Sequence, residues 1–133
     1  MPAIRLWYDP PAEELGSNEL EFLGMLGGPA CLVVPGLDHG RCRFLVTLLH
    51  GNEPSGIIAL HRWLTQPRET PAVDIYCVVM NIEAAMTKPN FSFRQLPGRR
   101  DLNRCFRQPF DDAEGMLAAA LLSLIHRHQP EAL

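Results

Sequence analysis

The chain has 133 residues, of which 47% are hydrophobic and 20% are charged, and its formal net charge is -3. This length allows one domain with a substantial core but is too short for two ordinary domains. The composition is that of a globular chain and excludes extensive disorder. Because there is no excess of basic residues, the chain is a poor candidate for binding nucleic acid.

No segment has the features of a membrane span or an export signal. The longest apolar run, Met116 to Leu122, is far shorter than the roughly 20 residues that a membrane-spanning helix needs. The first residues lack a cationic region followed by an apolar stretch. We therefore expect a cytoplasmic protein with no membrane partner. Its four cysteines are expected to be reduced thiols, with a disulfide between Cys31 and Cys42 as the alternative.

The first part of the chain is predicted to contain one helix and short apolar strands. Residues 1–16 hold three prolines and are predicted to be irregular, with a short strand at Ile4–Tyr8. Ser17 or Asn18 can cap a helix that runs to about Leu26. The segments that follow are a short apolar run at Ala30–Val34, a break at Pro35-Gly36 and a predicted turn at Asp38-His39-Gly40.

The remaining elements alternate between strand and helix. Arg43–Leu49 is a nearly continuous apolar run, typical of a strand covered on both faces. The segment after Pro54 has apolar residues at helical spacing, and Val73–Met80 is the next predicted buried strand. A polar arm at Arg94–Phe106 and a last helix, capped by Asp111 or Asp112 and reaching about His128, complete the order. This alternation predicts an α/β fold with a mostly parallel or mixed sheet flanked by helices.

His50 and Glu53 are the first candidate site residues. They follow the strand predicted at Arg43–Leu49, and the carboxyl ends of strands are where sites gather in such sheets. Imidazole nitrogen and carboxylate oxygen are ligands that zinc accepts. Gly51 between them allows a sharp backbone turn. The H-x-x-E spacing alone is weak, and the competing interpretation is a histidine that only forms hydrogen bonds at the surface.

The second candidate group is the segment Asp101-Leu102-Asn103-Arg104. A guanidinium group binds carboxylates through two parallel hydrogen bonds, and the amide of Asn103 can both donate and accept. The pair Asn103 and Arg104 therefore suits a ligand with a free carboxylate. Arg94, Arg99 and Arg100 lie close by in sequence, and one of them is a candidate for a second anion contact. The alternative is a surface loop in which the aspartate caps a helix.

Taken in order, these motifs resemble those of the succinylglutamate desuccinylase/aspartoacylase family, which is related to the zinc carboxypeptidases. The resemblance covers roughly residues 30–130. The segments that carry it are Leu49-His50-Gly51-Asn52-Glu53-Pro54-Ser55-Gly56, Asn81-x-Glu83-Ala84, Arg94 and Asp101-Leu102-Asn103-Arg104-Cys105-Phe106. Two separate motifs in the same order are much more specific than either alone. The resemblance implies a carboxypeptidase-like (phosphorylase/hydrolase-like) α/β fold.

The resemblance also implies roles for individual residues. His50 and Glu53 match two ligands of a Zn²⁺ ion, and Asn103 and Arg104 match the pair that holds the substrate carboxylate. Arg94 matches an arginine that polarises the scissile carbonyl, with Arg99 as the competing candidate. The implied reaction is zinc-dependent hydrolysis of the amide bond of a small N-acyl amino acid.

Two parts of the implied site are missing. The resemblance calls for a third zinc ligand, a histidine on a strand after the last helix, and for a catalytic glutamate further along. The sequence reaches Leu133 without either group, so residues 1–133 are expected to form a single amino-terminal part of a zinc-dependent deacylase or carboxypeptidase-like catalytic domain. His126 and His128 lie two apart near a helix end and point in different directions, and His39 and His61 are no better placed.

The missing groups leave other functions open. The chain could be a fragment of a longer enzyme or a truncated relative that binds carboxylates or peptide termini without catalysis. The predicted last helix is apolar nearly all round, so part of its surface would be left uncovered. An interaction role, including a homo-oligomer formed through this surface, is the third possibility.

Overall fold

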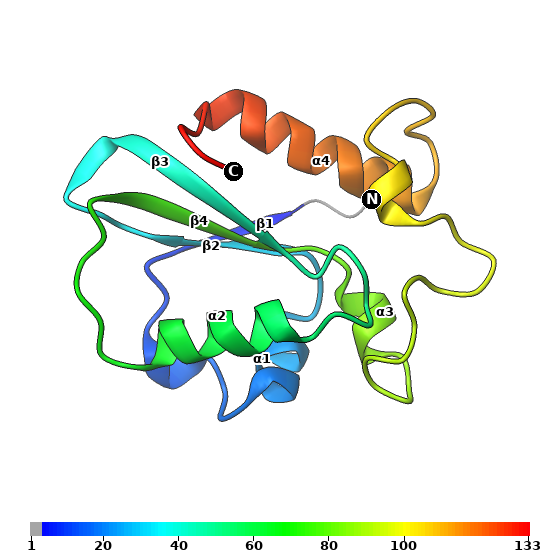
Figure 1. Ribbon diagram of the computed structural model, residues 1–133, viewed down its shortest axis with the longest axis horizontal. Helices are drawn as coiled ribbons and strands as arrows, with labels where there is room; N and C mark the ends of the chain where they lie inside the picture. Colours follow the sequence, from blue (N-terminus) through cyan, green and yellow to red (C-terminus); the bar gives the residue numbers. More distant parts are fainter. Residues whose placement is uncertain (1–3) are drawn as a thin grey trace.

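A mixed β-sheet with helices on both faces forms the framework of the protein (Figure 1). The structure is a computed structural model and describes residues 4–133. The strands are β1 (Arg5–Tyr8), β2 (Ala30–Val34), β3 (Asp38–Thr47) and β4 (Val73–Val79). The helices are α1 (Glu19–Leu26), α2 (Ser55–Thr65), α3 (Ile82–Met86) and α4 (Ala113–His128), with short 3-10 turns η1 (Ala12–Glu14) and η2 (Leu102–Arg104).

The sheet has the strand order β1-β2-β4-β3. β1 pairs with β2 and β3 pairs with β4 in parallel, whereas β2 and β4 are antiparallel. The predicted α/β class with a mixed sheet is therefore confirmed. β3 and β4 run the same way, so the segments that follow them emerge at the same end of the sheet. The backbone N–H groups of Met80 and Asn81 continue this contact by donating to the carbonyls of Thr47 and Leu48.

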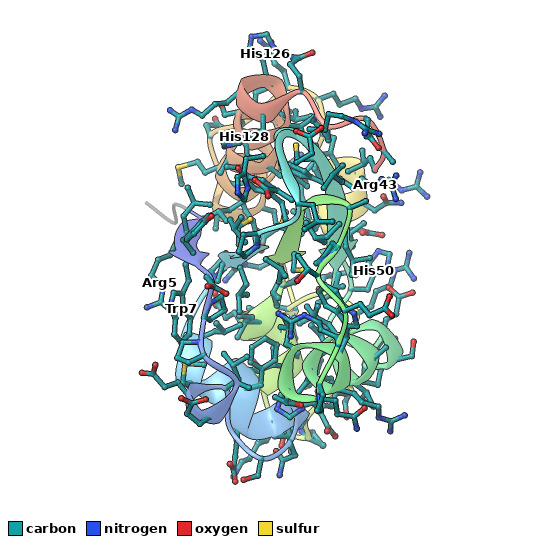
Figure 2. The ribbon with its side chains drawn as sticks, turned by 90° about the vertical axis from the view of Figure 1, so that its left-hand side faces the viewer. Arg5, Trp7, Arg43, His50, His126 and His128 are labelled. Atoms are coloured by element: carbon teal, nitrogen blue, oxygen red, sulfur yellow. The ribbon has the colours of Figure 1, made fainter. Side chains whose placement is uncertain are left out.

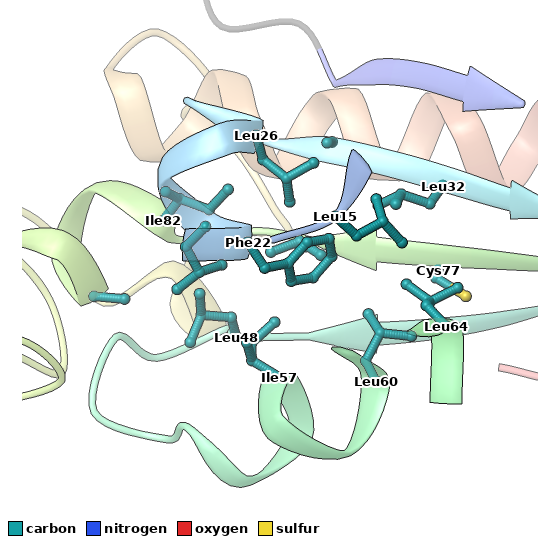
Figure 3. Close-up of a cluster of buried hydrophobic side chains, with 14 of the residues drawn as sticks. Leu15, Phe22, Leu26, Leu32, Leu48, Ile57, Leu60, Leu64, Cys77 and Ile82 are labelled. Atoms are coloured by element: carbon teal, nitrogen blue, oxygen red, sulfur yellow. The ribbon is translucent and has the colours of Figure 1, made fainter. Parts of the chain in front are cut away.

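Two buried clusters hold the layers together, one on each face of the sheet. Phe22 of α1 lies in the middle of the first cluster, which joins α1 and α2 to the sheet (Figure 3). On the other face α4 packs its Leu117, Leu121 and Leu124 against the strands. Burying side chains of this size contributes roughly 1.5–3 kcal/mol each, so the two faces together supply the main stabilising term.

The predicted turn at Asp38-His39-Gly40 is wrong, because these residues belong to β3. The turn lies earlier and is fixed by packing. Gly36 approaches β4 so closely that a Cβ there would lie 2.2 Å from the Val73 carbonyl carbon. The Gly36 N–H donates to the buried carboxylate of Asp74 at 2.7 Å. This anchor sets the start of β3 five residues earlier than its apolar run indicates.

The four cysteines are free thiols in the structure, as expected from the sequence. All four cysteines are buried and free, and burial raises the pKa of Cys31 and Cys77 to about 12. Thiols in this state are poor nucleophiles. Within residues 4–133 no helix is both long and apolar enough to cross a membrane.

The start of α4 gives a test of stability against pH. The Asp112 carboxylate caps α4 by accepting from the Gly115 N–H at 2.8 Å and pairs with Arg100 at 2.6 Å. Hydrogen bonds from Arg100 and then from Gly115 lower the pKa of Asp112. Its ionisation therefore stabilises the fold above the unfolded-state pKa of about 3.9, and this contribution is lost as pH falls below that value.

Asp112→Asn keeps an N-cap acceptor but removes the charge. We expect the free energy of unfolding of this variant to fall less steeply than that of the parent between about pH 5 and pH 2, as measured by urea unfolding. Asp111→Asn, at the exposed neighbouring carboxylate, is the control. Equal slopes for the parent and Asp112→Asn would contradict the assignment.

Candidate active site

The candidate site is built on the turn that leads from β3 into α2. β3 ends at Thr47, and Leu48 then adopts a positive φ of 60° that redirects the chain. The Glu53 N–H donates to the His50 carbonyl at 3.2 Å and closes the turn. Pro54 follows as the N-cap of α2, where a missing N–H costs no hydrogen bond. The turn thus brings His50 and Glu53, three residues apart, to one side.

Gly51 lets this turn pack against two other segments. Its N–H donates to the Arg94 carbonyl at 3.0 Å. A Cβ at this position would lie 2.4 Å from the Phe93 carbonyl oxygen and 2.7 Å from the Ala84 Cβ. No side chain fits there, so the glycine is required by close backbone approach. The turn after β3, the start of α3 and the arm near Arg94 therefore meet at this point.

His50 is buried and has a carboxylate at each ring nitrogen. Its Nδ1 lies 2.6 Å from Oε1 of Glu53, and its Nε2 lies 2.8 Å from Oδ1 of Asp101. The Glu53 side chain is 57% exposed, whereas that of His50 is only 9% exposed. The imidazole is thus fixed by the fold, while the Glu53 carboxylate faces solvent. The simple surface-histidine interpretation does not fit this burial.

Asp101 connects His50 to the arm between α3 and α4. Its Oδ1 also accepts from the Asn103 N–H at 2.9 Å, and its Oδ2 accepts from the Arg94 guanidinium at 3.2 Å. Leu102 and Cys105 anchor this otherwise polar arm, because both are fully buried in the cluster beneath α4. The result is a continuous chain of contacts from Glu53 through His50 and Asp101 to Arg94.

The charge on Asp101 is favoured by its partners. Burial acts to raise the pKa of this carboxyl, but hydrogen bonds from the Asn103 N–H, from His50 and from Arg94 outweigh it. The pKa of Asp101 therefore lies below its ordinary value. The Asp101 carboxylate is therefore ionised at neutral pH and is a strong acceptor that holds the orientation of the imidazole ring.

Asn103 and Arg104 lie on the exposed side of η2. Together with Phe106 and Arg107 they line an open depression of about 270 Å³. His50 does not line this depression, so the two candidate groups are linked through Asp101 and not by a shared cavity. The Asp101 carboxylate also caps η2 through the Asn103 N–H, which is the capping role considered from the sequence.

Of the three nearby arginines, only Arg94 contacts this chain of side chains. Arg99 pairs with Glu83 at 3.0 Å and with Glu114 at 2.7 Å. Arg100 is held by Asp112. The Arg94 side chain is 51% exposed, so its guanidinium is also accessible to a ligand. The geometry therefore favours Arg94 over Arg99 as the arginine of the site.

The other four histidines lie elsewhere, as the sequence spacing indicated. His61 contacts the Gly16 carbonyl at 3.0 Å, and His39 contacts Asp74 at 2.9 Å. His126 and His128 are at the carboxyl end of α4, away from His50 (Figure 2). Within residues 4–133 no three His, Cys, Asp or Glu side chains gather in a way that could hold a metal ion.

The pair His50 and Glu53 nevertheless suits a divalent cation. Carboxylate oxygens only accept hydrogen bonds, so two carboxylates around one imidazole require hydrogen on both ring nitrogens or a cation at one of them. A divalent cation held by His50 and Glu53 would remove the need for the second hydrogen, and Asp101 would then accept from Nε2. This is the usual second-sphere support of a metal-bound histidine. Nitrogen plus carboxylate oxygen is a donor set compatible with zinc.

Asp101 is the site residue whose role the sequence did not predict. Its position at the head of the Asp-Leu-Asn-Arg motif was the available signal, but the motif indicated only a cap. The contact with His50 joins residues 51 positions apart in the chain. Such a contact has no local sequence pattern and depends on how the arm folds back.

The packing around Gly51 gives a direct test of the turn. Gly51→Ala is expected to lower the free energy of unfolding by about 1–3 kcal/mol or more, because the new Cβ meets backbone atoms that cannot move aside. Gly28→Ala is the matched control, since a Cβ there has no atom within 4 Å. Urea denaturation of both variants measures the difference. Similar small changes in the two would show that the turn is not packed as described.

Comparison with known proteins agrees with the arrangement of these motifs. Residues 41–133, more than two-thirds of the chain, match the family model described as succinylglutamate desuccinylase/aspartoacylase catalytic domain. No curated protein and no solved structure matches the chain. The match contains His50, Glu53, Arg94 and the Asp101–Arg104 segment. The chain therefore belongs to the succinylglutamate desuccinylase/aspartoacylase catalytic domain family.

Proposed function

We propose that this protein takes part in the zinc-dependent hydrolysis of the amide bond of an N-acyl amino acid. His50 and Glu53 supply two zinc ligands, and Asn103 and Arg104 hold the carboxylate of the substrate. The observation that carries the proposal is the convergence of His50 Nδ1 and Glu53 Oε1 at 2.6 Å, with Asp101 at the other ring nitrogen. Family membership also supports the proposal, because His50 and Glu53 match the positions of two zinc ligands in the family's motifs.

In this proposal the side chains of the site have different roles. Zinc, when bound, supplies a Lewis acid that activates water and polarises a carbonyl. Asp101 fixes the ring of His50 by accepting from Nε2, so Nδ1 stays directed at Glu53. Glu53 is exposed enough to adjust to a ligand without disturbing the core. Arg94 presents a half-exposed guanidinium that can stabilise negative charge on a substrate oxygen.

The substrate carboxylate is assigned to η2. Asn103 and Arg104 are both exposed and line the same depression. A guanidinium fork with a neighbouring amide matches a carboxylate in charge and in geometry. The Phe106 side chain beside them adds an apolar surface for the body of the ligand. A small N-acyl amino acid has both features, a free carboxylate and an uncharged acyl amide.

Zinc binding is the first test. The zinc-loaded protein is expected to retain about one zinc ion per chain after gel filtration, and His50→Ala and Glu53→Ala are expected to lose it. Asp101→Asn should weaken zinc binding by about 10- to 100-fold, because it removes the support of the ligand and not the ligand itself. His126→Ala, at an exposed histidine, is the control. Zinc retained equally by all variants would exclude His50 and Glu53 as ligands.

A second candidate function is a binding module for carboxylates that works without metal. It is favoured because, within residues 4–133, no group of three His, Cys, Asp or Glu side chains is arranged so that it could hold a metal ion. Both functions use Asn103 and Arg104, so only their dependence on metal separates them.

Calorimetry with N-acetyl and N-succinyl amino acids, with and without chelator, separates these functions. We expect binding to need zinc and to weaken about tenfold or more in Arg104→Lys, which loses the two-point contact of the guanidinium. Release of free amino acid in the zinc-loaded sample would support hydrolysis. Equal binding in the presence of chelator, with no release, would favour the binding module.

A further inference from the structure

A pocket lies at the end of the sheet where β4 leads into α3. Its volume is about 430 Å³. Its walls come from the end of α1 and the turn after it, from the segment that follows β4 and forms α3, from Arg99, and from the start of α4. Figure 1 shows α3 and the start of α4 at one end of the sheet, whereas the last residues of the chain follow the other end of α4. The pocket is therefore formed by packing among interior segments, and the last residues contribute nothing to its walls.

The polar part of the pocket is one guanidinium shared by two carboxylates. Arg99 Nε donates to Oε2 of Glu114 at 2.7 Å, and its Nη1 donates to Oε1 of Glu83 at 3.0 Å. Its Nη2 also lies 2.7 Å from Oε2 of Glu114. Two negative charges and one positive charge leave this group with an excess of negative charge. Because every nitrogen of Arg99 already faces a carboxylate, the group favours a cation over an anion.

Glu114 has an oxygen that no described residue uses. Its side chain is only 7% exposed, and both contacts with Arg99 are made by Oε2. Within residues 4–133 the enclosed side-chain atoms that lack a partner belong to Gln95 and His128, so Oε1 of Glu114 is not enclosed. Since Glu114 lines the pocket, this oxygen is open to it. A largely buried carboxylate oxygen without a donor gains free energy when a bound group donates to it.

The rest of the pocket is apolar, and one side of it lacks a side chain. Leu23, Met80, Ile82 and Leu117 are buried and line it. Gly28 also lines it, although its φ is not positive and a Cβ there would have no atom within 4 Å. The backbone therefore does not require glycine at this position. The missing side chain leaves space that a ligand can occupy.

We propose that this pocket binds a small primary amine with an apolar body, of the alkylammonium class. The ammonium group donates to Oε1 of Glu114, and the 64% exposed carboxylate of Glu83 adds attraction at the opening. The apolar body packs against Leu23, Met80 and Leu117. The volume lies within the range of small-ligand pockets, roughly 300–1,000 Å³. None of the residues assigned to the proposed hydrolysis lines this pocket, so it is a second and independent site.

A titration followed through methionine methyl groups tests the proposal on the whole chain. The probe is n-hexylamine, which is protonated at about pH 7, and n-hexanol and hexanoate are its neutral and anionic analogues. We expect saturable shifts of the Met80 and Met86 methyl resonances with hexylamine, because both side chains line the pocket. Met25 is on α1 outside the pocket and should not shift. Hexanol should bind at least about tenfold more weakly, and hexanoate should not bind.

Two kinds of variant separate charge from space. Glu114→Gln should weaken hexylamine binding at least about tenfold, because it removes the charge of the buried carboxylate. Glu83→Gln, at an exposed side chain that leaves the core intact, should weaken binding about two- to fivefold. Glu13→Gln, at an exposed carboxylate on η1, is the charge control and should bind like the parent. Gly28→Phe should fill the pocket and abolish the shifts, whereas Gly28→Ala should retain them.

Three results would overturn the proposal. The first is the absence of a saturable Met80 shift with hexylamine. The second is equal affinity for hexylamine and hexanol, which would leave an apolar cavity without selectivity for a cation. The third is a natively folded Gly28→Phe variant that binds hexylamine like the parent. Should Glu114→Gln fail to fold, Glu83→Gln and Gly28→Phe still decide the outcome.

Discussion

The parallel pairing of β3 with β4 is the constraint on which the rest of the molecule depends. It places the ends of both strands at the same edge, and the hydrogen bonds of Met80 and Asn81 to Thr47 and Leu48 extend the contact past the sheet. The turn after β3 and the start of α3 are thereby forced together. Gly51 against Ala84 is the tightest point of that contact. Function in α/β sheets tends to lie at such strand ends because several loops converge there.

Asp101 holds the side chains at this edge of the sheet in fixed positions. One carboxylate receives hydrogen bonds from an imidazole, a guanidinium and a backbone N–H, so it links the turn at His50 to the arm at Arg94 and to η2. Most residues of the arm at Arg94–Phe106 are polar and bury little apolar surface that could stabilise its position. The burial of Leu102 and Cys105 under α4 supplies the missing stabilisation. The hydrophobic cluster on one face of the sheet therefore determines the geometry of polar groups at its edge.

The two ends of α4 contact different parts of the structure. At its start Asp112 caps the helix and holds Arg100, which leaves Arg94 as the arginine that reaches Asp101. At its other end the chain returns to β3 and begins a strand contact through Glu131 and Ala132. The same helix therefore supports the candidate active site at one end and an exposed apolar groove along its side. Phe106 lines both this groove and the depression at η2.

Local sequence patterns were sufficient for the class of fold and for most elements. Apolar runs and helix caps depend on neighbouring residues, so strand β4 and helices α1, α2 and α4 followed from the sequence. Each cap was narrowed to two neighbouring residues, and the structure selects Asn18 and Asp112. The motifs around His50 and Asn103 likewise identified the family, because the order of residue types is itself a sequence property. The start of β3 did not follow, since the contact of Gly36 with Val73 and Asp74 fixes it from another strand.

Only the tertiary structure decided which side chains meet. The motifs placed His50 and Glu53 together because three residues at a turn bring them to one side. They did not reveal Asp101 as the partner of Nε2, and they favoured Arg94 with Arg99 as the competing candidate. That choice depended on Glu83 and Glu114, which engage Arg99, and on the arm that returns Asp101 to the turn. The sequence by itself thus determined the family and the residue types of the site, whereas long-range packing determined their contacts.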